Sequence, residues 1–307
     1  MGVENNTILH YLSDKKRFAD LINAEVYNGR QVINPEYLTD ISTATYAKIE
    51  RNSEGKLPRR RERRGDLAMK YKDGSLYRIF VGEAQSNVHY AMPIRNIEYA
   101  AAYYKKQYDD LKREHERERD LKGVDEFLSG IKKEDRIKPV HLLWIYHGEK
   151  AWDGPRTLKD MMDFGDEKDG FSEIFRDFKP HLLCINEMEC TEKYHTELRA
   201  LLDMLRLVEY KTELLELIET DERFWGLDEE TYEAAAILLK IGSIWEKRDK
   251  YKDEGGRYSM CKALRDWEAE IRAEERKIKE EQKRIIEKKD EEIASLKEEI
   301  RKLKEDR

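Results

Sequence analysis

Residues 65–86 read GDLAMKYKDGSLYRIFVGEAQS, and this stretch decides the fold. Apolar and polar side chains alternate from Asp66 to Tyr71 and again from Leu76 to Gln85, which is the two-residue period of a β-strand. Lys72-Asp73-Gly74-Ser75 separates the two runs, and Asp-Gly between alternating segments is a strong hairpin signal. The stretch therefore predicts two antiparallel strands with a tight turn at Asp73-Gly74.

A two-residue turn at Asp73-Gly74 also predicts the register of this hairpin. Asp66 is then expected opposite Val81, and Glu83 and Gln85 follow on the same face because side chains alternate along a strand. The other face is expected to pack on a helix, since it carries the apolar side chains of Leu67, Met69, Tyr71, Leu76 and Phe80.

The two acids on one face of the hairpin, Asp66 and Glu83, point to a metal ion. Neighbouring carboxylates repel one another and lose hydration when they are buried, so a cation is needed to neutralise them. Mg²⁺ takes one or two carboxylates with a carbonyl and waters, and it activates water for phosphodiester hydrolysis. The alternative is a surface hairpin with scattered acids, which is common in a chain of which 41% of the residues are charged.

The segments on both sides of the hairpin predict a mixed α/β fold. A helix is expected from Asp14 to Tyr27, and a second from Tyr90 to about Arg119, with Pro93 in its first turn. The run PVHLLWIY at residues 139–146 predicts a strand buried on both faces, and residues 181–185 predict a weaker strand. The order is therefore helix, hairpin, helix, strand.

Proline separates this mixed region from a helical one. All six prolines lie at or before Pro180, and proline interrupts helices. We therefore expect a first domain over residues 1–186, a helical region over residues 187–260 and one long charged helix over residues 261–307.

The last half of the long helix has the pattern of a coiled coil. Isoleucine recurs every seventh residue, and leucine follows three residues after the last two: Ile286, Ile293 and Ile300 with Leu296 and Leu303. Isoleucine at heptad position a with leucine at d favours a parallel two-stranded coil, so a homodimer is expected. Because Lys289 takes one d position, a single solvated helix held by Glu–Lys pairs is the alternative.

The composition excludes several classes of protein. The 59 Lys and Arg residues are outnumbered by 66 Asp and Glu residues, and the net charge of −7 excludes a uniformly basic DNA-coating protein. No apolar run approaches the roughly 20 residues that span a bilayer. The N-terminus carries no export signal, and the three cysteines form no disulfide framework. We expect a cytoplasmic protein without a membrane partner.

An aspartate on one strand, a hairpin and Glu-x-Gln on the next strand resemble the PD-(D/E)XK nuclease superfamily. The chain is more closely similar to the Rpn family of recombination-promoting nucleases, also described as transposases. Seven motifs in order carry this resemblance: FADLIN at 18–23, GRQVI at 29–33, EAQS at 83–86, YAMPIR at 90–95, IYHG at 145–148, WDGP at 152–155 and MCKAL at 260–264. The likeness covers the chain up to about residue 270.

The resemblance implies a restriction-endonuclease-like α-β-β-α-β core, followed by a helical region and a C-terminal coiled-coil helix. It implies that Asp66 and Glu83 hold Mg²⁺, or Mn²⁺ in its place, with the Ala84 carbonyl as a third ligand. Gln85 would orient the attacking water, although much of the superfamily has lysine there. An amide offers only neutral hydrogen bonds, so activity is expected but can be slow.

The superfamily often adds an acid from its first helix, and two residues compete for this role. Asp20 matches the family's Phe-Ala-Asp run and is preferred. Glu25 lies on the apolar side of the predicted helix with Phe18 and Ile22, where a carboxylate is unusual.

Basic residues near the acids predict contact with nucleic acid. The segment KLPRRRERR at residues 56–64 is expected to neutralise phosphates through Arg59, Arg60, Arg61, Arg63 and Arg64, the alternative being a solvated loop. Arg95, in the first turns of the second predicted helix, can contact the scissile phosphate or pair with Glu83.

These expectations converge on an enzyme, a Mg²⁺-dependent DNA endonuclease that hydrolyses phosphodiester bonds. The family name implies a role in recombination or DNA mobility. The alternative is a nuclease-derived scaffold that binds DNA or protein without cutting, which Gln85, the negative net charge and the coil also permit.

Overall fold

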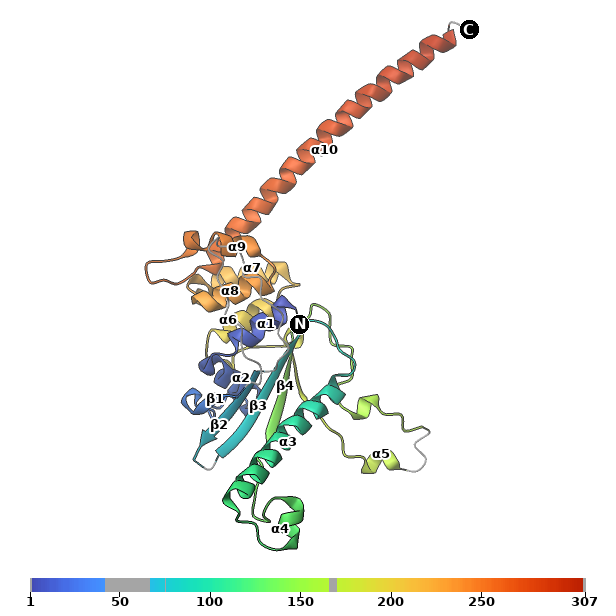
Figure 1. The fold of residues 1–307 in the computed structure, drawn as a ribbon. Helices are drawn as coiled ribbons and strands as arrows, with labels where there is room; N and C mark the ends of the chain where they lie inside the picture. The colour runs from blue at the N-terminus through green and yellow to red at the C-terminus, as the bar shows by residue number, and fades with distance from the viewer. Residues whose placement is uncertain (1, 42–66, 75, 166–169, 306–307) are drawn as a thin grey trace.

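The computed structural model describes residues 2–41, 67–74, 76–165 and 170–305. In these residues, five strands and ten α-helices follow one another in the order α1-α2-β1-β2-β3-α3-α4-β4-α5-β5-α6-α7-α8-α9-α10. Figure 1 shows the sheet in the middle, the helical region at one end and the last helix projecting away from both. The mixed α/β class predicted from the sequence is confirmed.

The helices and strands have the following bounds. The strands are β1 Leu38–Asp40, β2 Leu67–Asp73, β3 Leu76–Gln85, β4 Val140–Tyr146 and β5 His181–Cys184. The α-helices are α1 Val3–Tyr11, α2 Lys15–Tyr27, α3 Met92–Glu118, α4 Val124–Ser129, α5 Phe171–Ile174, α6 Leu198–Arg206, α7 Lys211–Thr220, α8 Glu229–Leu238, α9 Gly242–Glu246 and α10 Met260–Glu305. Short 3-10 helices lie at Pro35–Tyr37, Lys159–Met161, Ile185–Glu187, Glu222–Trp225 and Arg248–Tyr251.

The five strands form one sheet in the order β1-β2-β3-β4-β5. β1, β2 and β3 pair antiparallel, whereas β3, β4 and β5 pair parallel. Parallel neighbours need a crossover connection, and α3 lies in the connection between β3 and β4. The predicted hairpin therefore supplies two inner strands of the sheet, β2 and β3, and β3 is the central strand of the sheet.

The hairpin has a different register from the one that the sequence predicted. Val81 pairs with Ala68 instead of Asp66, and Asp73 pairs with Leu76 at the end of the ladder. The turn therefore begins at Gly74, whose φ of +53° glycine adopts without strain. Because the shift is two residues, every side chain keeps the face that the alternation assigned to it.

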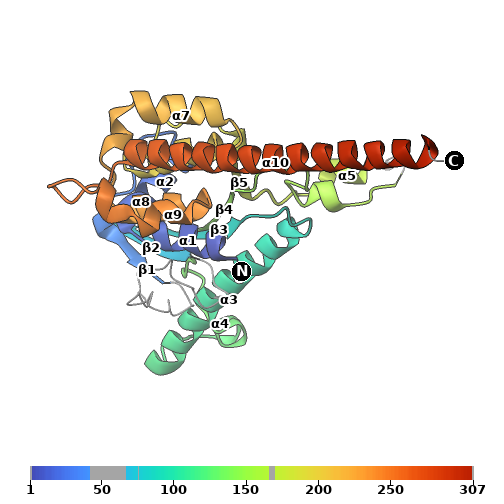
Figure 2. The ribbon, with the colours of Figure 1, turned by 90° about the horizontal axis from the view of Figure 1, so that it is seen from above.

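The two faces of the sheet carry separate cores. Leu67, Met69, Tyr71 and Phe80 are buried with α2 and the helical region, as predicted, and Phe18 of α2 contacts Phe80 edge to face. On the other face, Ala68, Ile79 and Val81 are buried under α3. Figure 2 shows α2 and α3 on opposite sides of the strands. The face that bears Glu83 is therefore also a core.

The two predicted helices of this region, α2 and α3, begin and end within two residues of the positions that the sequence indicates. Asp14 caps α2 by accepting hydrogen bonds from the backbone N–H groups of Lys16 and Arg17. Asn28 ends the same helix in the left-handed conformation, and Pro93 lies in the first turn of α3. α1 and β1 were not expected from the sequence.

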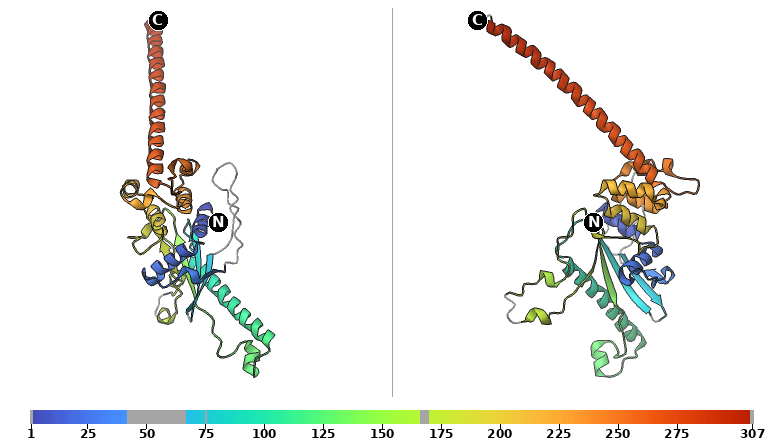
Figure 3. Two further views of the ribbon diagram at one scale, coloured as in Figure 1. Left: turned by 90° about the vertical axis from the view of Figure 1, so that its left-hand side faces the viewer. Right: turned by 180° about the vertical axis from the view of Figure 1, so that it is seen from behind.

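The helical region shares one hydrophobic core with the sheet. This core joins residues of α1, α2 and β2 to residues of α6, α8 and the beginning of α10. In α10, Met260, Ala263 and Leu264 are buried, whereas the isoleucines from Ile271 to Ile293 and Leu296 are exposed. The helix of 46 residues, about 69 Å at 1.5 Å per residue, thus has a fixed base and a projecting shaft (Figure 3).

Among the residues that the structure describes, none of the helices combines the length and the apolar content needed to cross a bilayer.

Candidate functional site

Glu83 is a buried acid near the end of the central strand β3. Only 1% of the residue is exposed, and its parallel neighbour on β4 is Trp144. Alternation places its side chain on the α3 face, opposite to Phe80 and Ala84. A carboxylate in such a place must be compensated by charge or hydrogen bonds.

Two side chains donate to the same oxygen of Glu83. Arg95 Nη2 lies 2.5 Å from Glu83 Oε1, and Gln85 Nε2 lies 2.6 Å from it. Burial acts to lower the pKa of Arg95, but the Glu83 carboxylate and Tyr99 outweigh it and raise the pKa. The guanidinium thus neutralises the buried acid in this structure.

The first turns of α3 position the residues around Glu83. Arg95 and Tyr99 are one turn apart, and Arg95 Nη2 donates to Tyr99 Oη at 3.3 Å. Asn96 is fully buried on the adjoining stripe of the helix, and neither atom of its amide has a hydrogen-bond partner among the described residues. Arg95, Tyr99 and Asn96 therefore bring a cation, a hydroxyl and an amide to this side of β3.

The structure brings together three of the residues predicted for the site: Glu83, Gln85 and Arg95. The side chain of Ala84 belongs to the core on the other face, so only its backbone could serve as a ligand. Asp66 lies outside the described residues. Leu67, which follows it in the sequence, pairs with Gly82, which precedes Glu83.

The predicted phosphate-binding arginines, Arg59, Arg60, Arg61, Arg63 and Arg64, lie outside the residues that the structure describes. Their role stays a prediction. Arg95, the remaining predicted phosphate contact, pairs with Glu83, which is one of the two possibilities stated for it.

Asp20 is not brought to Glu83, because α2 covers the opposite face of the sheet. Its carboxylate accepts hydrogen bonds from the backbone N–H groups of His195 and Thr196 and from the Thr196 hydroxyl, all within 3.0 Å. These bonds fix the segment that enters α6. The geometry gives Asp20 a structural role, and the preference for it as a catalytic acid finds no support in this arrangement.

Glu25, the competing acid of α2, also lies in a network of its own. Tyr194 Oη donates to it at 2.5 Å, and Lys193 Nζ and His181 Nε2 lie at 2.8 and 3.2 Å. Burial raises the pKa of Glu25, but these hydrogen bonds outweigh it and lower the pKa to about 2. These partners belong to β5 and to the segment before α6, so Glu25, like Asp20, is engaged on the face of the sheet opposite to Glu83.

The sequence assigned no role in the site to two polar residues near the end of β3, His147 and Asn5. The backbone N–H of His147 donates to the Gln85 carbonyl at 3.0 Å, and His147 Nε2 lies 2.7 Å from Asn5 Oδ1 of α1. Burial lowers the pKa of His147 to about 4, so the ring is neutral and its Nε2–H donates to the asparagine. The signal in the sequence was the position of His147, directly after the predicted strand 139–146.

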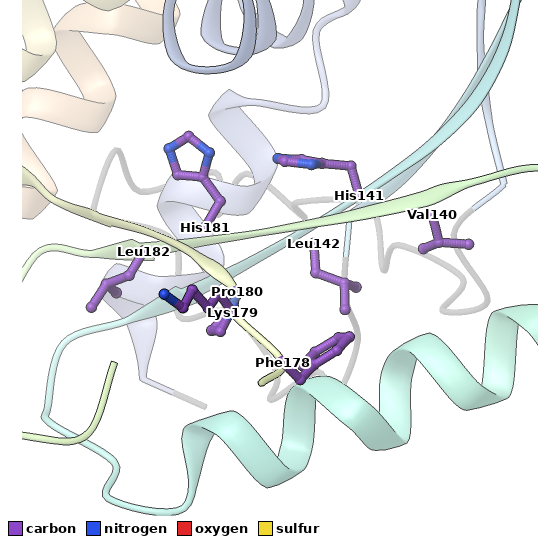
Figure 4. Close-up of a pocket in the computed structure, with 8 residues that line it drawn as sticks. All are labelled: Val140, His141, Leu142, Phe178, Lys179, Pro180, His181 and Leu182. Carbon is purple, nitrogen blue, oxygen red and sulfur yellow. The ribbon is translucent and has the colours of Figure 1, made fainter. Parts of the chain in front are cut away.

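A pocket of about 520 Å³ lies at the other end of the parallel strands (Figure 4). Its polar side chains are His141, His181 and Lys179, and the two imidazole rings are 5.6 Å apart. Burial lowers the pKa of His141 to about 4, which makes it neutral at physiological pH. The pocket is lined at the beginning of β4 and β5, whereas Glu83 and Gln85 lie at the end of β3.

Oxygen donors on the Glu83 face match the ligand type that Mg²⁺ prefers. The described residues supply one buried carboxylate, that of Glu83, and one amide oxygen, that of Gln85, whose nitrogen donates to Glu83. No group of three or more His, Cys, Asp or Glu side chains able to hold a metal occurs in the described part of the chain. The described residues fit one carboxylate ligand of a Mg²⁺ site, and the second would have to come from Asp66.

Comparisons with protein-family models, with curated proteins and with solved structures give no match to this chain.

Proposed function

We propose that the protein is a Mg²⁺-dependent endonuclease that hydrolyses phosphodiester bonds in DNA. The observation that carries this proposal is the buried Glu83 carboxylate near the end of the central strand, next to Gln85 and Arg95. The pairing of Leu67 with Gly82 supports it, because these residues adjoin Asp66 and Glu83 in the sequence. The proposal also rests on the resemblance to the PD-(D/E)XK nucleases.

In this proposal Asp66, Glu83 and the Ala84 carbonyl hold the metal. When bound, Mg²⁺ would polarise the phosphoryl oxygen and lower the pKa of a water. Gln85 orients the attacking water through neutral hydrogen bonds, which predicts slower hydrolysis than with a lysine at this position. Water attacks phosphorus in line with the leaving oxygen.

Arg95 has a second role in this proposal. It neutralises Glu83 while no substrate is bound, and a guanidinium is well suited to bind phosphate with two hydrogen bonds. Its side chain is 30% exposed, so it can turn from Glu83 to a phosphate without unpacking the core. The arginines at positions 59–61, 63 and 64 would contact the DNA backbone beyond the cut.

Nicking of supercoiled plasmid by the full chain tests the assignment. Mg²⁺- or Mn²⁺-dependent nicking is expected, with loss of about 100-fold or more in Asp66→Ala and Glu83→Ala. Asp110→Ala is the matched control, because Asp110 is exposed and, among the residues that the structure describes, forms its ion pair with Arg113 at the surface. Equal nicking by all three variants would remove the site from the mechanism.

A specific observation favours a second candidate, a nuclease-derived scaffold that binds DNA or protein without cutting. Arg95 and Gln85 both donate hydrogen bonds to Glu83 Oε1, as expected of an ion pair that stabilises the fold. A scaffold of this kind is expected to show no saturable binding of Mg²⁺ or Mn²⁺ that the substitution Glu83→Gln abolishes. Calorimetric titration with either metal distinguishes it from the enzyme.

A further inference from the structure

We propose that α10 binds α10 of a second copy of the chain, parallel and in register from Ile286 onward, so that both sheets lie at the same end of the coil. The seam is the line of a and d positions along which the two helices would pack. Exposed apolar side chains and charged residues in the described part of α10 support its orientation and its starting point. Only the use of this arrangement for cutting two strands rests on the proposed function.

The shaft of α10 carries an apolar stripe that the rest of the described chain does not cover. Ile286, Ile293 and Leu296 are 59%, 47% and 57% exposed, and their spacing of seven and three residues places them on one side of the helix. The stripe has the spacing of a and d positions, with isoleucine at a and leucine at d. A second copy offers the matching surface, because identical layers stack on each other in a parallel pair.

The charges beside the stripe select the parallel orientation. With Ile286 at a, Glu292 occupies position g and Lys297 occupies position e, five residues later. In a parallel pair, g of one helix faces the following e of its partner, so Glu292 meets the Lys297 position of the second copy twice by symmetry. In an antiparallel pair, g faces g and e faces e, and this complementarity is lost.

The seam has a defined beginning. Upstream, Ile271, Ile278 and Ile285 are exposed and recur every seventh residue, one residue out of step with Ile286 and Ile293. Regular knobs-into-holes packing needs a constant heptad frame, so this step interrupts the stripe. We therefore place the first tight layer at Ile286, about 39 Å along the helix from Met260.

This geometry fixes where the two bodies lie. The base of α10 is buried against the helical region through Met260 and Leu264, so the shaft leaves each body in a set direction (Figure 1). A parallel coil then places both bodies at its N-terminal end. The two proposed active sites would then lie close enough to bind one DNA duplex, whereas an antiparallel coil would hold them at opposite ends.

Sedimentation of two single variants of the full chain tests the pairing without any assay of nuclease activity. Glu292→Lys and Lys297→Glu are each expected to raise the dissociation constant of the homodimer about tenfold, because two attractive pairs become repulsive. An equimolar mixture of the two variants is expected to form a heterodimer as tight as the wild-type homodimer. Glu291→Lys, at the outward f position, is the matched control.

Cysteine cross-linking tests the orientation. In a chain with Cys190→Ser and Cys261→Ser, Ile293→Cys should oxidise to a disulfide-linked dimer, since equivalent a positions meet only in a parallel, in-register pair. A wild-type chain that is monomeric at 50 μM would overturn the proposal. So would cross-linking only between Ile293→Cys and Leu296→Cys chains, which an antiparallel pair predicts. Either result leaves the nuclease proposal standing.

Discussion

Arg95 Nη2 donates to Glu83 Oε1 at 2.5 Å and so joins the first turns of α3 to the central strand of the sheet. The side chain of Glu83 is 2% exposed, whereas the side chain of Arg95 is 30% exposed. Removing one partner of such a pair leaves the other without compensation, which costs more than the pair contributes to stability. The contact therefore couples the stability of the fold to whatever cation neutralises Glu83.

Arg95→Met is expected to lower the free energy of unfolding by about 1–3 kcal/mol, because the Glu83 charge loses its main partner. Mg²⁺ should then raise the melting temperature of this variant more than that of the wild type, since a ligand that binds only the folded state stabilises it. Thermal unfolding with and without Mg²⁺ measures both effects. The double variant Arg95→Met/Glu83→Gln is the control, and a Mg²⁺ effect of the same size in it would contradict metal binding at Glu83.

Asp20→Asn is expected to destabilise the protein by about 1–3 kcal/mol without changing the rate of nicking per folded molecule. The neutral amide replaces a carboxylate that accepts bonds from His195 and Thr196. Urea unfolding gives the free energy, and nicking below the unfolding range gives the rate. A large loss of rate in fully folded protein would restore Asp20 to the catalytic site.

The hydrogen bonds of His115 are expected to make the stability of the folded protein depend on pH. Its Nδ1 lies 2.7 Å from Asp120 Oδ1 and its Nε2 lies 2.8 Å from Asp135 Oδ2. Hydrogen bonds to Asp120 and Asp135 raise the pKa of His115 above its ordinary value of 6.5. The contribution of these hydrogen bonds to the stability of the folded state is therefore full below pH 6.5. It is lost as the pH rises through the higher pKa that His115 has in the folded state.

Hydrogen exchange of the amides between α3 and β4 measures this contribution. Protection, corrected for the intrinsic exchange rate, should fall on going from pH 6 to pH 8.5 in the wild type. His115→Gln should be less protected at pH 6 and should lose the pH dependence. Equal protection of the wild type at both pH values would show that His115 does not titrate in this range.

Lys289→Leu is expected to tighten the proposed dimer about tenfold, because it replaces a like-charged layer at d by an apolar one. Lys288→Leu is the matched control, since position c faces solvent. Sedimentation at several protein concentrations gives the dissociation constants. Identical constants for the two variants would mean that residue 289 does not lie in the seam.

The faces of the hairpin could be predicted from the sequence, but its register could not. Alternation assigns Met69 and Phe80 to one face for any turn with an even number of residues, and the structure pairs these two directly. The register depends on the turn, and here Asp73 extends the ladder by pairing with Leu76. Side-chain pattern and turn geometry are separate constraints, and only the first has a period that sequence displays.

α1 shows where the sequence pattern fails. Its nine residues, VENNTILHY, contain two asparagines and no clear apolar stripe, so local propensity does not predict a helix. It forms because Ile8, Leu9 and Tyr11 are buried in the main core, and Asn5 binds His147. Tertiary packing supplied the stability that the local sequence lacks.

The sequence by itself determined strands β2 to β5, the long helices and the side of the hairpin on which Glu83 and Gln85 lie. Periods of two and 3.6 residues are local properties, which the chain carries whether or not it has folded. Only the tertiary structure decided that Arg95 pairs with Glu83 and that Asp20 binds the segment before α6. Those choices depend on which helix covers which face of the sheet, and contacts between segments far apart in the chain set that arrangement.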